Sequence, residues 1–236
     1  LNQIEKERMI RQEFFSNASH ELKTPITSIQ GYAALLESGM IQDEATKADF
    51  ASRIKKEAVR MTGLINDILM ISRLEAKEAE VTFSDVRVSV LLEEIIDSLK
   101  PQAAEAQVFV HVDCQPLMIH ANLQQMRELL TNLISNAIKY NRPGGQVWIN
   151  IRETDGQMVI RVKDNGVGIP SDSLDRVFER FYRVDKGRSR KQGGTGLGLS
   201  IVKHIVNFYH GTIHVSSEPD MGSEFTVFLP MFPEKG

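Results

Sequence analysis

The stretch FFSNASHELKTPITSIQGY, from Phe14 to Tyr32, decides how the first part of the chain folds. Apolar or small residues recur through it and around it at Leu1, Ile4, Phe15, Ala18, Leu22, Pro25, Ile29, Tyr32 and Leu36. Alternating intervals of three and four are typical of the seam of a helix in a bundle or coiled coil. If Phe15 is a heptad a position and Ala18 a d position, His20 falls at f, farthest from the seam. The pattern predicts a long helix on which His20 faces solvent.

His20 has an acidic neighbour, Glu21, and Thr24 lies four residues on, along the same exposed face. The zinc motif HExxH is excluded because Thr24 stands where the second histidine is needed. A histidine beside a carboxylate suits a nucleophile made more basic by its neighbour. An exposed histidine is also commonly an ordinary solvated side chain, so the pairing alone decides nothing. Pro25 has no N–H to offer the carbonyl of Glu21, and we expect the helix to bend or loosen there.

The composition of the 236-residue chain limits the class of protein. With 42% hydrophobic residues it can fill a core, and a net charge of −3 does not favour a general binder of nucleic acid or membrane surfaces. The single Cys114 excludes an internal disulfide and indicates a reducing compartment. We find no apolar run of about 18 residues, the length that a membrane-spanning helix needs, and no signal peptide. Because the chain opens inside a predicted helix without an initiator Met, we interpret it as a fragment of a longer protein.

The first helix is predicted to run from Gln3 to Ser38 and to stop at Gly39. A second helix carries one apolar stripe, formed by Phe50, Ile54, Met61, Leu64, Ile68 and Ile71. Two such helices form a hairpin that buries little alone, so we expect a dimer with a four-helix bundle. The alternative is that the hairpin packs on its own second domain. The heptads fade after Glu75, and we predict a helical dimerisation domain at 1–77 and a second domain at 78–236.

The second part of the chain alternates helices with short strands. We predict helices at 89–105, 122–140 and 197–209, and strands near 82–86, 108–112, 211–216 and 224–229. The segments QVWINIRE and MVIRVKD predict a hairpin that turns at Asp155 and Gly156. Helices alternating with mostly antiparallel strands indicate a two-layer α/β sandwich, so the predicted fold class of the whole chain is α+β.

The motif NLISNAIKY places Asn132, Asn136 and Lys139 on one helix face, followed by Tyr140. Two amides beside an ammonium group suit a polyphosphate and its cation better than they suit a core. An asparagine carbonyl oxygen is a reasonable ligand for Mg²⁺, which also keeps waters and phosphate oxygens. A solvated helix face would show the same residues, so the motif alone leaves both readings open.

The motif VKDNGVGIP places Asp164 at the end of a strand, before Gly166 and Gly168. Glycine at these positions lets the backbone turn tightly and approach a ligand. The Asp164 carboxylate could then accept a hydrogen bond from an exocyclic amine. A plain turn is the alternative, since Asp-Asn-Gly is also good turn chemistry.

The motif GGTGLGLSIV, residues 193–202, is a glycine cluster that leads into a helix, where backbone amides would face an anion. It is not a P-loop, because no GK[ST] follows, and the Ser/Thr kinase motifs HRD and DFG are absent. The preceding FERFYRVDKGRSRKQ combines aromatic residues with basic ones. A basic segment flanked by glycine is typical of a mobile cover over phosphates. Its basic residues are Arg183, Lys186, Arg188, Arg190 and Lys191.

In this order the motifs resemble the N, G1, F and G2 boxes of the sensor histidine kinases, whose ATP-binding domain shares its fold with gyrase, Hsp90 and MutL. FSNASHELKTPIT resembles the H box, and the resemblance covers essentially the whole chain. It is similar to the phosphate-regulation and cell-wall sensor subgroup, whose response regulators carry winged-helix DNA-binding domains. The resemblance implies the cytoplasmic portion of a bacterial membrane-anchored sensor, a homodimeric autokinase in two-component signal transduction. It implies ATP and Mg²⁺ as cofactors, a response regulator as partner, and no contact of this piece with nucleic acid or membrane.

The resemblance also implies roles for individual residues near the histidine. His20 would be the phosphoacceptor and attack the γ-phosphate through Nε2, while Glu21 would hold or take the proton on Nδ1. Arg183 would lend charge to the transferred phosphoryl group. The hydroxyl of Thr24 would orient a water toward an aspartyl phosphate on a bound regulator, which predicts a second, phosphatase activity.

For the nucleotide, the resemblance implies that Asn136 ligates Mg²⁺, Asn132 supports the site and Lys139 contacts phosphate. Tyr140 would line the adenine pocket and Asp164 would accept from the adenine amine. The remaining implied ATP-binding positions, whose glycines would shape the pocket and its lid hinge, are Gly166, Gly168, Phe181, Gly194, Thr195, Gly196, Leu197 and Gly198.

One position separates phosphoryl transfer from hydrolysis. The ATPase relatives carry a glutamate, the base that activates water, four residues before the magnesium-binding asparagine, and here that position is Asn132. An amide cannot act as a base, so we expect slow hydrolysis. Two alternatives remain: a nucleotide-binding scaffold that docks a regulator without transfer, which would require a broken catalytic box, and a stand-alone ATPase of the gyrase or Hsp90 type.

Overall fold

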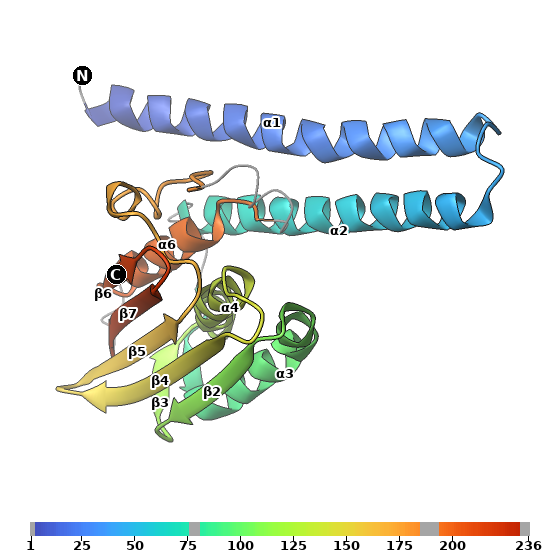
Figure 1. Cartoon of the computed structure of the whole chain (residues 1–236). Coiled ribbons are helices and arrows are strands. Elements are labelled where there is room, and N and C mark those ends of the chain that lie inside the picture. The colour runs from blue at the N-terminus through green and yellow to red at the C-terminus, as the bar shows by residue number, and fades with distance from the viewer. Residues whose placement is uncertain (1–2, 76–80, 185–193, 232–236) are drawn as a thin grey trace.

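The computed structural model describes residues 3–75, 81–184 and 194–231. Its first part is an antiparallel pair of long helices, α1 (Gln3–Glu37) and α2 (Glu44–Glu75), which project beyond the rest of the molecule (Figure 1). We call this pair the stem. Helix α1 continues through Pro25 to within one residue of its predicted end, so the lost hydrogen bond does not interrupt it. The predicted helical hairpin is confirmed.

The second part is built on a five-stranded sheet with the order β2-β4-β5-β7-β6. Its strands are β2 (Phe109–Cys114), β4 (Gln146–Thr154), β5 (Gln157–Asp164), β6 (Thr212–Glu218) and β7 (Gly222–Pro230). Strands β2 and β4 are parallel and the other neighbours antiparallel. The β4–β5 hairpin turns at Asp155 and Gly156, as predicted. This register leaves Asp164 at the last pair of the β4–β5 ladder, opposite Val147.

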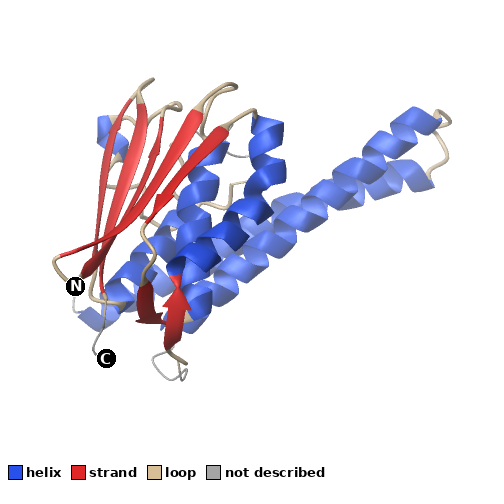
Figure 2. Cartoon of the chain, turned by 90° about the horizontal axis from the view of Figure 1, so that it is seen from below, coloured by secondary structure: helices blue, strands red, loops and turns tan. Residues whose placement is uncertain are grey.

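Three helices form the second layer: α3 (Val88–Ala106), α4 (Leu123–Lys139) and α6 (Gly198–Phe208). They cover one face of the sheet, as Figure 2 shows. The apolar residues between the layers are almost fully buried; among them are Leu129, Leu133, Ile149, Ile160, Ile205 and Val227. The predicted two-layer sandwich and the α+β class are confirmed. A small antiparallel pair, β1 (Ser84–Arg87) with β3 (Met118–Ala121), and a 3-10 turn at Ser171–Ser173 complete the fold. Neither β3 nor this turn was predicted.

The stem packs on the sandwich along one of its faces. Phe14 of α1 and Leu64 and Ile71 of α2 are buried in the same hydrophobic cluster as the sandwich core. Phe14 is 5% exposed and packs against Phe181, with ring centroids 5.7 Å apart and the rings tilted, whereas the neighbouring Phe15 is 58% exposed. The predicted domain boundary between residues 77 and 78 lies outside the described residues, and the division into 1–77 and 78–236 stays a prediction.

Several large apolar side chains of the stem remain exposed in the single chain even though the stem contacts the sandwich; they include Phe15, Ile26, Leu35, Val59 and Leu69. Packing on its own second domain therefore leaves apolar surface for the predicted dimer, which stays a prediction. None of the helices in the described ranges is long and apolar enough to cross a membrane.

Candidate active site

A cavity of about 460 Å³ opens between α4, the end of β5, β7 and the loop that leads into α6. Ten of the positions that the resemblance assigns to nucleotide binding line it, and Arg183 lines it too; the ten are Asn132, Asn136, Lys139, Tyr140, Asp164, Gly168, Gly194, Thr195, Gly196 and Gly198. Residues from three motifs far apart in the sequence thus meet at one site. Its size is that of a typical small-molecule pocket.

Helix α4 presents its polar face to this cavity because its other face is held by the core. Its N-terminus is capped by Asn122, whose side chain accepts a hydrogen bond from Gln125 N at 2.9 Å. The asparagines of the motif differ in their contacts. Asn132 donates from Nδ2 to the carbonyl of Glu128 at 2.9 Å, while the Asn136 side chain makes no hydrogen bond to another described residue. The Asn136 amide oxygen is therefore available to a ligand or cation.

Asp164 is buried, and only one of its two carboxylate oxygens accepts hydrogen bonds from the described residues. Its Oδ1 accepts hydrogen bonds from the backbone N–H groups of Gly166 at 2.8 Å and Ser223 at 3.3 Å, while Oδ2 accepts none from the described residues. Burial raises the pKa of this carboxyl to about 6, against the lowering effect of the two backbone hydrogen bonds. Gly166 does not line the cavity; it positions the carboxylate that does.

Two glycines of the cavity wall lie where another part of the backbone comes close. Gly168 and Gly196 have φ angles of +70° and +75°, a region that side chains disfavour. A Cβ on Gly168 would collide with the carbonyl of Glu218, and one on Gly196 would press on the backbone of Phe181. Phe181 and Leu197 themselves do not line the cavity. Phe181 donates its N–H to the carbonyl of Gly196 at 2.8 Å, and Leu197 is fully buried, so both support the loop.

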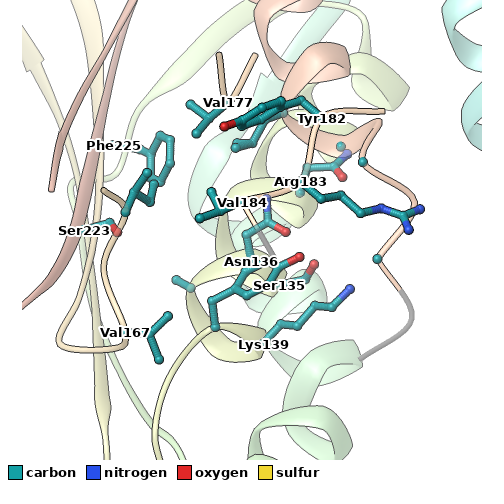
Figure 3. Close-up of a pocket in the computed structure, with 18 of the residues that line it drawn as sticks. Ser135, Asn136, Lys139, Val167, Val177, Tyr182, Arg183, Val184, Ser223 and Phe225 are labelled. Atoms are coloured by element: carbon teal, nitrogen blue, oxygen red, sulfur yellow. The ribbon is translucent and has the colours of Figure 1, made fainter. Parts of the chain in front are cut away.

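Positive charge gathers at one side of the cavity. Figure 3 shows the ammonium of Lys139 and the guanidinium of Arg183 extending to the same side, away from Phe225 and Ser223 on β7. Burial, together with the positive charges of Arg183 and Arg60, lowers the pKa of Lys139 to about 8. An anion at this side of the cavity would relieve the repulsion among these groups.

The histidine lies outside the cavity. His20 is exposed on α1, while the adjacent Glu21 carboxylate accepts a hydrogen bond from Arg183 at 2.7 Å and lies 3.8 Å from Arg60. The Arg183 side chain is only 5% exposed, although it belongs to the sandwich and its partner to the stem. Thr24 donates its hydroxyl to the carbonyl of His20 at 3.4 Å. The structure thus pairs Glu21 with Arg183 rather than with His20.

Some lining residues were not predicted from the sequence. An apolar wall is formed by Val167, Ile169 and Pro170, which follow the glycines of the motif VKDNGVGIP, and by the distant Val177 and Phe225; no local pattern marked these side chains as lining residues. Asp67 of α2 did leave one, because it lies three residues after Leu64 and four before Ile71, on the buried face of its helix. The basic positions Lys186, Arg188, Arg190 and Lys191 and residue Gly193 lie outside the described residues, and their role as a cover stays a prediction.

Two family profiles match the chain in separate ranges. The profile of the histidine kinase-, DNA gyrase B- and HSP90-like ATPases matches residues 121–233, and that of the His Kinase A phosphoacceptor domain matches residues 10–77. A similar curated protein is the sensor protein kinase WalK of Staphylococcus saprophyticus, 37% identical over 230 residues, which are 97% of this chain. The chain spans only 37% of the length of that relative.

Solved structures show the same fold. The histidine kinase AdeS of Acinetobacter baumannii has a TM-score of 0.72 at 23% identity, over 90% of this chain and 98% of its own. The histidine kinase ThkA, solved in complex with the response regulator protein TrrA, has a TM-score of 0.76 at 23% identity, over 99% of this chain and 67% of its own. At such identities these two likenesses concern the fold alone.

Proposed function

The chain belongs to the sensor histidine kinases of two-component systems, and we propose that it transfers the γ-phosphate of ATP to His20 and then to an aspartate of a response regulator. The observation that carries this proposal is the contact between Arg183 and Glu21 at 2.7 Å. It joins the wall of the nucleotide cavity to the residue next to the phosphoacceptor within one chain.

The nucleotide would lie with its base against the apolar wall and its phosphates toward the cations. The free Oδ2 of Asp164 is the acceptor for the adenine amine, and Tyr140 lines the same end of the site. Lys139, with a pKa lowered to about 8 by burial, gains from a polyphosphate beside it. The amides at the start of α6, reached through Gly194, Gly196 and Gly198, face the same charge.

The donor set fits a magnesium ion bound together with the nucleotide. Asn136 would hold it through an amide oxygen that no described residue uses, and Asn132 would support the site beside it. When bound, such an ion neutralises charge on the phosphates. The protein's own cations, Lys139 and Arg183, supply the rest of the stabilisation.

In the transfer step, Nε2 of His20 forms a bond to the γ-phosphorus while the bond from that phosphorus to the bridging oxygen of ADP breaks. Glu21 takes the proton from Nδ1, which keeps the lone pair on Nε2 available. Because Glu21 is paired with Arg183 in this structure, the step requires both side chains to leave that pair. Arg183 would then turn its charge to the transferred group.

The position of Asn132 distinguishes this proposal from a stand-alone ATPase. Its Nδ2 donates to the carbonyl of Glu128, and an amide cannot draw a proton from water. We therefore infer transfer rather than hydrolysis. The Thr24 hydroxyl is exposed on the same helix, one turn beyond His20, which supports the proposed phosphatase activity toward a bound regulator.

The partners follow from the same premise. The apolar residues left exposed on the stem support a homodimer with a four-helix bundle, and the complex of ThkA with TrrA supports a response regulator as partner. We propose that this regulator has a winged-helix output domain, and that the chain is the cytoplasmic portion of a membrane-anchored sensor.

The test is incubation with radiolabelled ATP and magnesium. The wild-type chain should acquire label that is stable to base and labile to acid, and His20→Ala should acquire none. Label that persists on His20→Ala, or ATP turnover without phosphohistidine on the wild type, would overturn the proposal; the second result would favour a stand-alone ATPase. Nucleotide binding with neither label nor turnover would favour a scaffold.

A further inference from the structure

One acidic side chain of the stem reaches into the nucleotide cavity. Asp67 of α2 lines it beside Asn132, Lys139 and Thr195, and no other described residue of the stem does so. Its Oδ2 accepts a hydrogen bond from the Thr195 hydroxyl at 2.7 Å. The buried neighbours Leu64 and Ile71, on the same face of α2, hold Asp67 in this position.

Thr195 is linked to the stem in two ways, directly through Asp67 of α2 and indirectly through Arg183, which is paired with Glu21 of α1. Its hydroxyl donates to Asp67 and accepts from the N–H of Leu197 at 3.2 Å. Its carbonyl accepts from Arg183 at 3.1 Å, and Arg183 in turn is paired with Glu21. The glycine loop that would wrap the phosphates is therefore fastened to α1 and α2 by two carboxylates.

The charges around Asp67 are those that a phosphate would seek. Lys139 acts on it from α4 as an opposite charge, and Arg183 and Arg60 in turn act on Lys139 from the F-box segment and from α2. Glu128, also on α4, acts on Asp67 as a like charge. Apart from Asp164, Asp67 is the only acidic side chain among the described residues that line the cavity, and it lies near the ammonium of Lys139.

We propose, on the basis of the proposed function, that Asp67 is a positioning residue that substitutes for a nucleotide phosphate when the stem is docked. Its carboxylate holds Thr195 and faces Lys139, so the phosphates of ATP must displace it or bind against its charge. Docking of α2 and binding of nucleoside triphosphate then oppose each other. This opposition is reciprocal, because an effect of the stem on nucleotide affinity equals the effect of nucleotide on docking.

The size of the effect follows from the charge removed. Two unit charges several ångströms apart near a protein surface interact strongly, and solvent screening reduces this interaction, so we expect about a tenfold change in affinity for a triphosphate. The change should be smaller for a diphosphate, which carries less charge. It should be absent for adenosine, which has no phosphate.

The experiment is calorimetric titration of the His20→Ala chain, which cannot consume ATP by phosphorylating itself. Asp67→Asn is the test variant, since an amide oxygen can still accept from Thr195 while the charge is gone. Asp49→Asn is the matched control: Asp49 lies on the same helix, is paired with Arg53 at 2.7 Å, and does not line the cavity. Each chain is titrated with Mg-ATP, Mg-ADP and adenosine, the last by competition, after circular dichroism shows that the variants are folded.

We expect Asp67→Asn to bind Mg-ATP about tenfold more tightly than its parent, Mg-ADP more tightly by less, and adenosine equally, with Asp49→Asn unchanged. Unchanged or weaker binding of Mg-ATP would refute the inference. Equal tightening for all three ligands would also refute it, because that result indicates a general opening of the cavity. These outcomes are distinct from failure of the proposed function, in which the parent chain binds no nucleotide or the wild type gains no phosphohistidine.

Discussion

Replacing Asp164 with asparagine tests the proposed nucleotide pose most directly. In the wild type, Oδ1 is held by the N–H groups of Gly166 and Ser223, which leaves Oδ2 to accept from the adenine amine. In Asp164→Asn the amide oxygen should keep these two backbone hydrogen bonds. The amide nitrogen would then take the place of Oδ2. Its N–H group would face the N–H group of the adenine amine, and two donors cannot form a hydrogen bond.

The expected loss follows from the hydrogen bond that disappears. A hydrogen bond to a charged group contributes about 1.5–3 kcal/mol, and the variant adds a mismatched pair of donors. A loss of about 2 kcal/mol corresponds to about thirtyfold weaker binding of ATP. Because guanine offers a carbonyl oxygen where adenine has its amine, GTP should lose much less affinity or gain some.

The assay is titration of Mg-ATP and Mg-GTP against both chains, with thermal melting as the control for folding. Burial raises the pKa of Asp164 from its ordinary value of 3.8 to about 6, so the folded state binds this proton more tightly than the unfolded state does. The resulting stabilisation of the folded state is fully present below pH 3.8 and is lost as pH rises through about 6. At pH 7.5 the neutral asparagine should therefore melt no lower than the wild type. Equal ATP affinity in a folded variant would refute the assigned adenine contact.

The same carboxyl makes a prediction about pH. Adenine binding requires the ionised form, so wild-type affinity for ATP should fall by up to about tenfold for each pH unit below 6, beyond the fall seen with Asp164→Asn. A matched pair of pH profiles measures the difference between the two chains. Parallel profiles would show that Asp164 does not titrate in contact with the nucleotide.

Three further substitutions address the chemistry and the loop. Glu21→Gln can still accept from Arg183 but cannot take a proton, so the initial rate of labelling at His20 should fall by about a hundredfold or more, and an unchanged rate would remove Glu21 as the base. Thr24→Ala should keep autophosphorylation and lose dephosphorylation of the regulator's aspartyl phosphate; unchanged dephosphorylation would contradict its role. Gly196→Ala places a side chain at a φ of +75° and close to the Phe181 backbone, so titration should show weaker ATP binding. Gly63 lies in open space on α2, so Gly63→Ala should leave ATP affinity unchanged. Equal ATP affinity of the two variants would contradict the argument from strain in the loop.

Much of the architecture was predictable because its signals are local. The heptads of α1, the alternation of β4 and β5 and the Asp155–Gly156 turn each lie within a few residues of sequence, and each predicted element is present. The strand Met118–Ala121 was not predicted, because four residues are too few to show a period and its partner is Ser84–Arg87, far away in the sequence.

At the site, the sequence alone determined which chemical groups are present: an exposed His20 beside an acid, the asparagines of α4, Asp164, and glycines where loops must come close. Tertiary structure decided which groups meet. The pairing of Glu21 with Arg183 and the entry of Asp67 into the cavity depend on how α1 and α2 dock against the sandwich. Periodicity marks Leu64 and Ile71 as an apolar face of α2, but it does not say what that face packs against, because Phe14, Leu64 and Ile71 are buried against residues distant in the chain.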